Sequence, residues 1–159
     1  MNPINRTTVR ATFTRPADTT NYTAGDAVGS LLKFELPSGV QTGRVMAGRL
    51  WHGDETKTTG DDFRLYLFQQ LPALTPVDNA ARATPWITEA DSKSFVGQMD
   101  FETGVALADA IFYESQDMVP STGLCFKTKG TTLYGILAAI GTYNPASAEP
   151  FSIQLHLET

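Results

Sequence analysis

The chain has 159 residues, a length that favours one domain with its own hydrophobic core. Its 12 basic and 17 acidic residues give a net charge of −5, which argues against nucleic-acid binding because such binding requires clustered lysines and arginines. A single cysteine excludes an internal disulfide, and the longest apolar run, near residues 133–140, is too short to cross a bilayer. We therefore expect one domain over residues 1–159, with residues 1–6 as a flexible N-terminal arm and with no nucleic-acid or membrane partner.

The first expected element is a strand over residues 7–15. Val9, Ala11 and Phe13 alternate there with polar residues, and strict alternation is typical of a strand with one buried face and one wet face. The same alternation returns over residues 151–158. The chain is therefore expected to begin and end in half-buried strands.

Further apolar segments lie between these two, separated by turn-forming residues. In chain order, the expected strands are residues 27–36, 43–52, 63–69, 94–101, 108–114, 124–128 and 132–143. Residues 53–62 form a polar loop, and residues 85–87 are expected to begin another strand or an extended segment. Short strands at such spacing indicate an all-β fold, and we expect a jelly-roll-like β-sandwich of about eight or nine strands.

Residues able to carry out catalysis are few and scattered. His52 follows a tryptophan at the rim of an expected loop, and His156 lies on the polar face of the last strand; neither fits a zinc-binding pattern. Cys125 has apolar neighbours, so we expect it to be a buried core residue rather than a nucleophile. We expect no enzymatic activity, no metal and no cofactor.

An acidic cluster in the polar loop leaves two interpretations open. Its members are Asp54, Glu55, Asp61 and Asp62. They could collect oxygen ligands for a hard cation, but their spacing matches no known calcium loop and Lys57 lies among them. A solvated loop is the better interpretation.

Aromatic residues give the only hint of binding. The candidates are the tryptophans and tyrosines of the chain: Tyr22, Trp51, Tyr66, Trp86, Tyr113, Tyr134 and Tyr143. Some could be sugar-stacking platforms, as on a carbohydrate-binding jelly roll. Packing in the core or between subunits is favoured, because most of them lie within strand patterns.

Three segments in order resemble a known group of proteins. They are RATFTRPADTTNYTAGDAVG at residues 10–29, FRLYLFQQLPALTPVDNAA at residues 63–81 and SFVGQMDF at residues 94–101. Together they resemble small structural proteins of tailed bacteriophages, especially capsid decoration (cement) proteins. The likeness covers the first two thirds of the chain, is weaker after Thr103, and consists of packing and turn motifs.

The resemblance implies a non-enzymatic virion protein on the outside of an icosahedral head. It implies a homo-oligomer, a trimer or a dimer, that binds the major capsid protein at capsomer junctions after assembly in the host cytoplasm. Because interfaces favour tryptophan, tyrosine and arginine, we expect the contacts to come from Arg49, Trp51, Tyr66 and Trp86. The alternatives are a head-fibre base, tail or baseplate accessory protein, a carbohydrate-binding jelly-roll module, and a glycosidase fragment.

Overall fold

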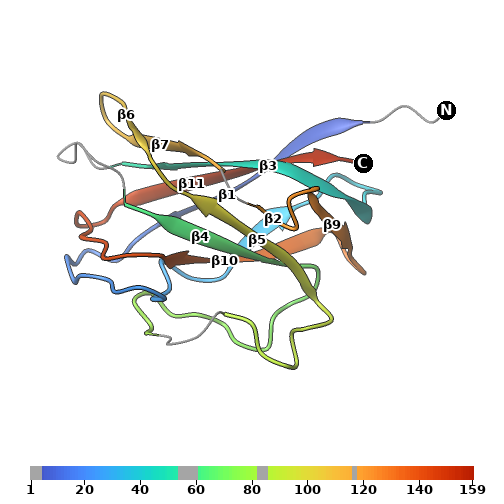
Figure 1. The fold of residues 1–159 in the computed structure, drawn as a ribbon, viewed down its shortest axis with the longest axis horizontal. Helices are drawn as coiled ribbons and strands as arrows, with labels where there is room; N and C mark the ends of the chain where they lie inside the picture. The colour runs from blue at the N-terminus through green and yellow to red at the C-terminus, as the bar shows by residue number, and fades with distance from the viewer. Residues whose placement is uncertain (1–4, 54–60, 82–85, 116–117) are drawn as a thin grey trace.

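The computed structural model describes residues 5–53, 61–81, 86–115 and 118–159 (Figure 1). These residues contain no helix and form eleven strands. The strands are β1 Arg6–Thr14, β2 Leu32–Glu35, β3 Thr42–His52, β4 Phe63–Phe68, β5 Phe95–Phe101, β6 Val105–Ala106, β7 Ile111–Glu114, β8 Met118–Val119, β9 Leu124–Lys127, β10 Thr132–Ala139 and β11 Pro150–Glu158.

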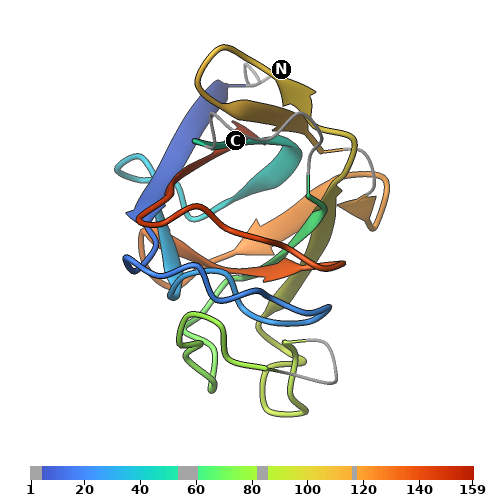
Figure 2. The same cartoon turned by 90° about the vertical axis from the view of Figure 1, so that its left-hand side faces the viewer.

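The strands form two antiparallel sheets packed face to face (Figures 1 and 2). One sheet has six strands in the order β1-β11-β3-β7-β6, with β9 also paired to β3. The other has five strands in the order β2-β10-β4-β5-β8. The expected all-β sandwich is therefore confirmed.

Strand prediction was correct where a segment is long enough to show its pattern. All nine segments from 7–15 to 151–158 contain a strand, although several are shorter than expected. The predicted number of strands, eight or nine, is smaller than the eleven in the described residues. The two short strands β6 and β8 have only two residues each and show no alternation. Residues 86 and 87 are not a strand; they belong to the long connection between β4 and β5.

The two chain ends lie side by side in the six-stranded sheet. β1 pairs with β11 without interruption from Arg6 opposite Glu158 to Thr14 opposite Pro150. Within the expected N-terminal arm, residues 1–4 lie outside the described residues. Asn5 and Arg6 are not loose, because the backbone of Asn5 bonds to that of Thr159 in both directions.

The core lies between the sheets and is built from alternate residues of the strands. Val9 and Ala11 of β1 face the same interior as Ile153 and Leu155 of β11, and Leu65 and Phe101 of the other sheet complete it. Their polar neighbours in sequence face outward. Burial of one face of each sheet is the main favourable term in holding such a sandwich together.

Gly97 allows β5 and β8 to lie close together. Its backbone φ of 152° is one that residues other than glycine rarely adopt. A Cβ added there would lie 2.4 Å from the Val119 carbonyl oxygen. We expect Gly97→Ala to lower the free energy of unfolding by about 2–3 kcal/mol. Urea denaturation would measure the loss.

Gly130→Ala is the matched control. An added Cβ there meets no atom within 4 Å, so its effect should stay within about 0.5 kcal/mol. Equal stability of the two variants would contradict the role assigned to Gly97.

Candidate functional site

The two sheets differ in what lies on their outer faces. The outer face of the five-stranded sheet carries a second buried cluster: Ala27, Tyr66, Phe68, Trp86, Ile136 and Ala138. The connection between β4 and β5 runs beneath this sheet in Figure 1. No described segment runs across the outer face of the six-stranded sheet in that view, and we call this surface the open face.

Strand pairing places the residues of the open face in two rows. Opposed residues in neighbouring strands lie on the same side of a sheet. One row runs Thr12, Ser152, Trp51 and Phe112, and the next runs Arg10, Gln154, Arg49 and Glu114. The open face therefore draws its side chains from β1, β11, β3 and β7.

The first row contains an aromatic pair. The rings of Trp51 and Phe112 lie 5.2 Å apart at an angle of 43°. Phe112 is paired in turn with Val105 of β6, whose side chain is largely exposed. These three residues form an apolar patch on the open face.

The second row is polar and connected. Arg49 forms an ion pair with Glu114 at 3.1 Å, and both side chains are substantially exposed. Gln154, with its amide oriented to suit its neighbours, accepts hydrogen bonds from the Arg10 guanidinium. Exposed pairs of this kind contribute little to the free energy of folding. Their side chains can therefore change conformation to contact a partner at a small cost in free energy.

A hollow of about 600 Å³ opens beside Trp51. Arg10, Thr12, Asp109 and Ser152 contribute to its lining. The Ser152 hydroxyl oxygen is sheltered from solvent and has no hydrogen-bond partner among the described residues. The site can therefore offer an aromatic surface together with both charged and hydroxyl groups.

The structure places the four expected contact residues in two separate regions. Arg49 and Trp51 are neighbours on the open face. Tyr66 and Trp86 are only 5% and 6% exposed and lie in the cluster on the other side of the molecule. The Trp86 indole N–H donates to the Gly25 carbonyl at 2.9 Å, so this side chain is used within the chain.

Cys125 is exposed, so its expected burial in the core was wrong. It lies in β9, where burial alternates, and it is Leu124 and Phe126 that face inward. Apolar neighbours in sequence lie on the opposite face of a strand and give no information about the residue between them.

His52 lies at the end of β3, next to the polar loop as expected, and its side chain is fully buried. It is the last residue of β3, and its ring is bonded on both sides. Nδ1 contacts the Glu149 carboxylate, and Nε2 lies 3.1 Å from the Tyr113 hydroxyl. This histidine is the first member of a buried polar network at one end of the sandwich.

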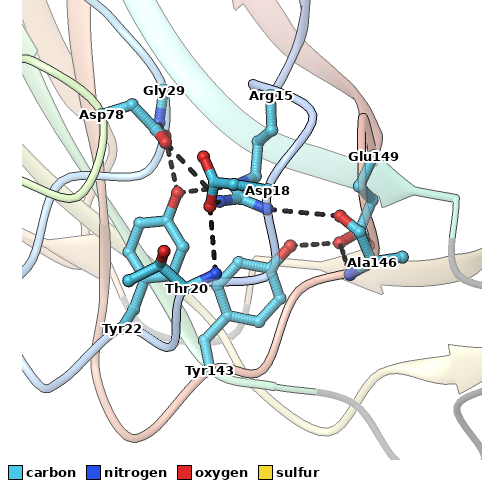
Figure 3. Close-up of polar contacts among 9 residues, drawn as sticks. All are labelled: Arg15, Asp18, Thr20, Tyr22, Gly29, Asp78, Tyr143, Ala146 and Glu149. Atoms are coloured by element: carbon cyan, nitrogen blue, oxygen red, sulfur yellow. Dashed lines mark hydrogen bonds and ion pairs between the residues drawn. The ribbon is translucent and has the colours of Figure 1, made fainter.

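Glu149 continues this network, and Figure 3 draws it beside Tyr143 and Ala146. Besides the contact with His52, its carboxylate accepts a hydrogen bond from the Tyr143 hydroxyl and one from the Ala146 N–H at 3.2 Å. The side chains of Glu149 and His52 are completely buried. Burial raises the pKa of Tyr143 far above its ordinary value of 10, and the nearby Glu149 carboxylate raises it further.

Arg15 donates to the Ala146 carbonyl at 3.3 Å and so extends the network to the connection between β1 and β2 (Figure 3). It donates to the Tyr22 hydroxyl at 2.5 Å and lies 3.5 Å from Asp78. Tyr22 donates in turn to Asp78 at 2.6 Å, and the Gly29 N–H donates to the same carboxylate. The network thus ties together three connections that are far apart in sequence.

We interpret this network as structural. Arg15, His52 and Glu149 are each at most 2% exposed, and each is hydrogen-bonded: Arg15 donates to the Tyr22 hydroxyl, and His52 contacts Glu149. A paired and hydrogen-bonded charge can remain buried, whereas an unpaired one cannot. No pattern in the sequence indicated that these residues would meet.

The acidic cluster of the polar loop is only partly described. Asp54 and Glu55 lie outside the described residues, whereas Asp61 and Asp62 directly precede β4. Across the described ranges, no group of three or more His, Cys, Asp and Glu side chains could hold a metal ion. The same part of the chain contains no helix long and apolar enough to cross a membrane.

Comparison with protein-family models and with curated proteins returns no match for this chain.

Proposed function

We propose that this chain is a structural virion protein that binds the outside of a bacteriophage icosahedral capsid and stabilises it. It attaches to the major capsid protein at capsomer junctions as a homo-oligomer, a dimer or a trimer, and catalyses no reaction. The observation that carries the proposal is the open face, a broad sheet surface that holds Trp51, Phe112 and Arg49 together.

The composition of the open face suits adhesion to a protein. Aromatic residues and arginine are enriched at interfaces, and a few aromatic anchors commonly provide most of the binding energy. Val105, which is paired with Phe112, is 58% exposed, and Leu107, two residues further along the chain, is 52% exposed. A protein surface laid over this patch would remove apolar area from water.

Two sheltered polar atoms on β11 also support a protein partner. Ser152 Oγ and His156 Nε2 have no hydrogen-bond partner among the described residues, although neither atom is open to solvent. Both residues lie on the open face, opposite Thr12 and Thr8 of β1. A contacting surface could supply the missing hydrogen bonds, which would favour a specific orientation.

Stabilisation of the shell follows from linkage. A protein that binds the assembled lattice, and not its separate subunits, shifts the equilibrium toward the lattice. Because the same site repeats over the shell and each oligomer binds through several copies, modest single contacts are sufficient.

The central test is replacement of the aromatic anchor. Trp51→Ala should weaken binding to purified heads by about 30-fold or more, because a buried aromatic anchor typically contributes at least 2 kcal/mol. Co-sedimentation with heads at increasing protein concentration would measure this.

Leu71→Ala is the matched control, since Leu71 is an exposed apolar residue, 62% exposed, in the connection between β4 and β5. Unchanged head binding by Trp51→Ala would contradict the proposed contact surface. The number of copies on each purified particle separates a shell protein, at hundreds of copies, from a tail, fibre-base or baseplate component at a few to a dozen.

A second candidate function is the binding of a host glycan in the hollow beside Trp51. Sugar rings stack on tryptophan, and Asp109, Arg10 and Ser152 could hydrogen-bond to hydroxyl groups there. Quenching of tryptophan fluorescence by a host polysaccharide would support this function, provided that Trp51→Ala abolishes it. Retained quenching in that variant would exclude the hollow.

A further inference from the structure

β1 is the longest free edge among the described strands. It has nine residues and pairs only with β11. The other edge strands of the described sheets have two or four residues each. In Figure 2, β1 forms the left-hand margin of the upper sheet.

The hydrogen-bonding pattern shows which backbone groups of β1 remain free. Asn5 and Thr159 exchange both backbone hydrogen bonds, at 3.1 and 2.9 Å, and the register then continues without a shift. In an antiparallel pair, bonded and non-bonded residues alternate. The odd-numbered residues of β1 therefore bond to β11. The N–H and C=O groups of Thr8, Arg10 and Thr12 point away from β11, in the plane of the sheet, and are free to bond to another strand.

This edge lacks the features that normally prevent pairing. Edge strands are commonly protected by proline, by lysine, by a bulge or by shortness. β1 contains no proline or lysine, and its register has no irregularity. Arg6 and Arg10 are its charged residues; Arg6 is paired with Glu158 at 3.3 Å and Arg10 bonds to Gln154.

We propose that two copies of the chain pair through β1, antiparallel about a two-fold axis, to form one continuous sheet. Such an interface is isologous, so the strand must complement itself. Pairing centred on Val9 places Thr8 of each copy opposite Arg10 of the other, and Arg6 opposite Thr12. Pairing centred on Arg10 would oppose two like charges and is disfavoured.

Pairing centred on Val9 matches the free groups as well as the side chains. Every hydrogen-bonded pair would join two even-numbered residues, whose N–H and C=O groups are the ones that β11 leaves free. The two-fold axis is perpendicular to the sheet, so both open faces lie on the same side. This inference deepens the proposed function and rests on it for its use, because the shared sheet doubles the contact surface.

The test is the oligomeric state of the purified chain, without capsids. Light scattering after size exclusion should report a dimer. Thr8→Pro should raise the dimer dissociation constant on the order of tenfold or more, because it removes a free-edge N–H from both copies. Thr8→Val, which keeps the N–H, should dimerise like the wild type.

Amide hydrogen exchange provides a second measurement that does not depend on folding of the variant. In the dimer, the amides of Thr8, Arg10 and Thr12 should be protected, and dilution should expose them. In a folded Thr8→Pro variant, those of Val9 and Ala11 should stay protected, because they bond to β11.

A monomer at high concentration, a trimer, or a dimer whose Thr8 and Arg10 amides exchange freely would overturn this pairing. So would edge amides that become protected only on capsids, because the occupant would then be a capsid segment. Failure of the proposed function is a different result: a β1-paired dimer that does not co-sediment with heads.

Discussion

Replacing Glu149 by alanine should lower the free energy of unfolding by about 3–5 kcal/mol. The carboxylate accepts from the Tyr143 hydroxyl and the Ala146 N–H and contacts Nδ1 of His52. Without it, an imidazole and a phenol stay buried with unmet hydrogen bonds, and each such group costs about 1–3 kcal/mol. Urea denaturation at pH 7 would measure the loss.

Two variants serve as controls for Glu149→Ala. Glu149→Gln keeps the shape and one acceptor oxygen, so its loss should be smaller. Glu114→Ala removes a carboxylate that is 62% exposed and should cost less than about 1 kcal/mol. An equal free energy of unfolding for Glu149→Ala and Glu114→Ala would contradict the inference that the buried network stabilises the fold.

The free energy of unfolding should fall steeply as the pH rises above about 10. Burial raises the pKa values of Tyr22, Tyr113 and Tyr143 well above their ordinary value of 10. Above that pH the unfolded chain releases these protons while the folded chain retains them, so the unfolded state binds fewer protons. The stabilisation is complete below pH 10 and is lost as the pH rises toward the folded-state values.

Each of the three tyrosines contributes a slope of up to about 1.4 kcal/mol per pH unit, which makes about 4 kcal/mol per pH unit for the three together. Urea denaturation at several pH values between 8 and 11 would measure the slope, and the tyrosinate absorbance of these three residues should appear only with unfolding. Tyr22→Phe should reduce the slope by about one third. A free energy of unfolding that stays constant up to pH 11 would refute the burial of these hydroxyls.

Local pattern was sufficient to predict the fold class. The alternation in residues 7–15 and 151–158 predicted two half-buried strands, and both occur as β1 and β11. The pattern does not contain the information that these two strands pair with each other. That pairing depends on the register of strands remote in sequence, which no local periodicity encodes.

The candidate site was predictable only in part, for the same reason. Trp51 and Arg49 were expected as contact residues and lie on the open face, but Phe112 was not singled out as the ring beside Trp51. Residue type alone also selected Tyr66 and Trp86, which are buried together in the cluster on the outer face of the five-stranded sheet. A tryptophan suits an interface and a core equally well, so its position has to be known first.

The error on Cys125 has a local cause. Cysteine among apolar residues resembles a core residue, yet strand alternation turns Cys125 outward. The burial of His52 has a distant cause, because Glu149 and Tyr113 supply its hydrogen-bond partners.

The two outer sheet faces are covered differently. The connection between β4 and β5 packs on the five-stranded sheet, whereas no described segment crosses the open face in Figure 1. In the proposed function, a subunit that binds through its open face turns this connection away from the capsid. Peptides fused to the connection would then project outward, which makes it the site to choose for peptide display.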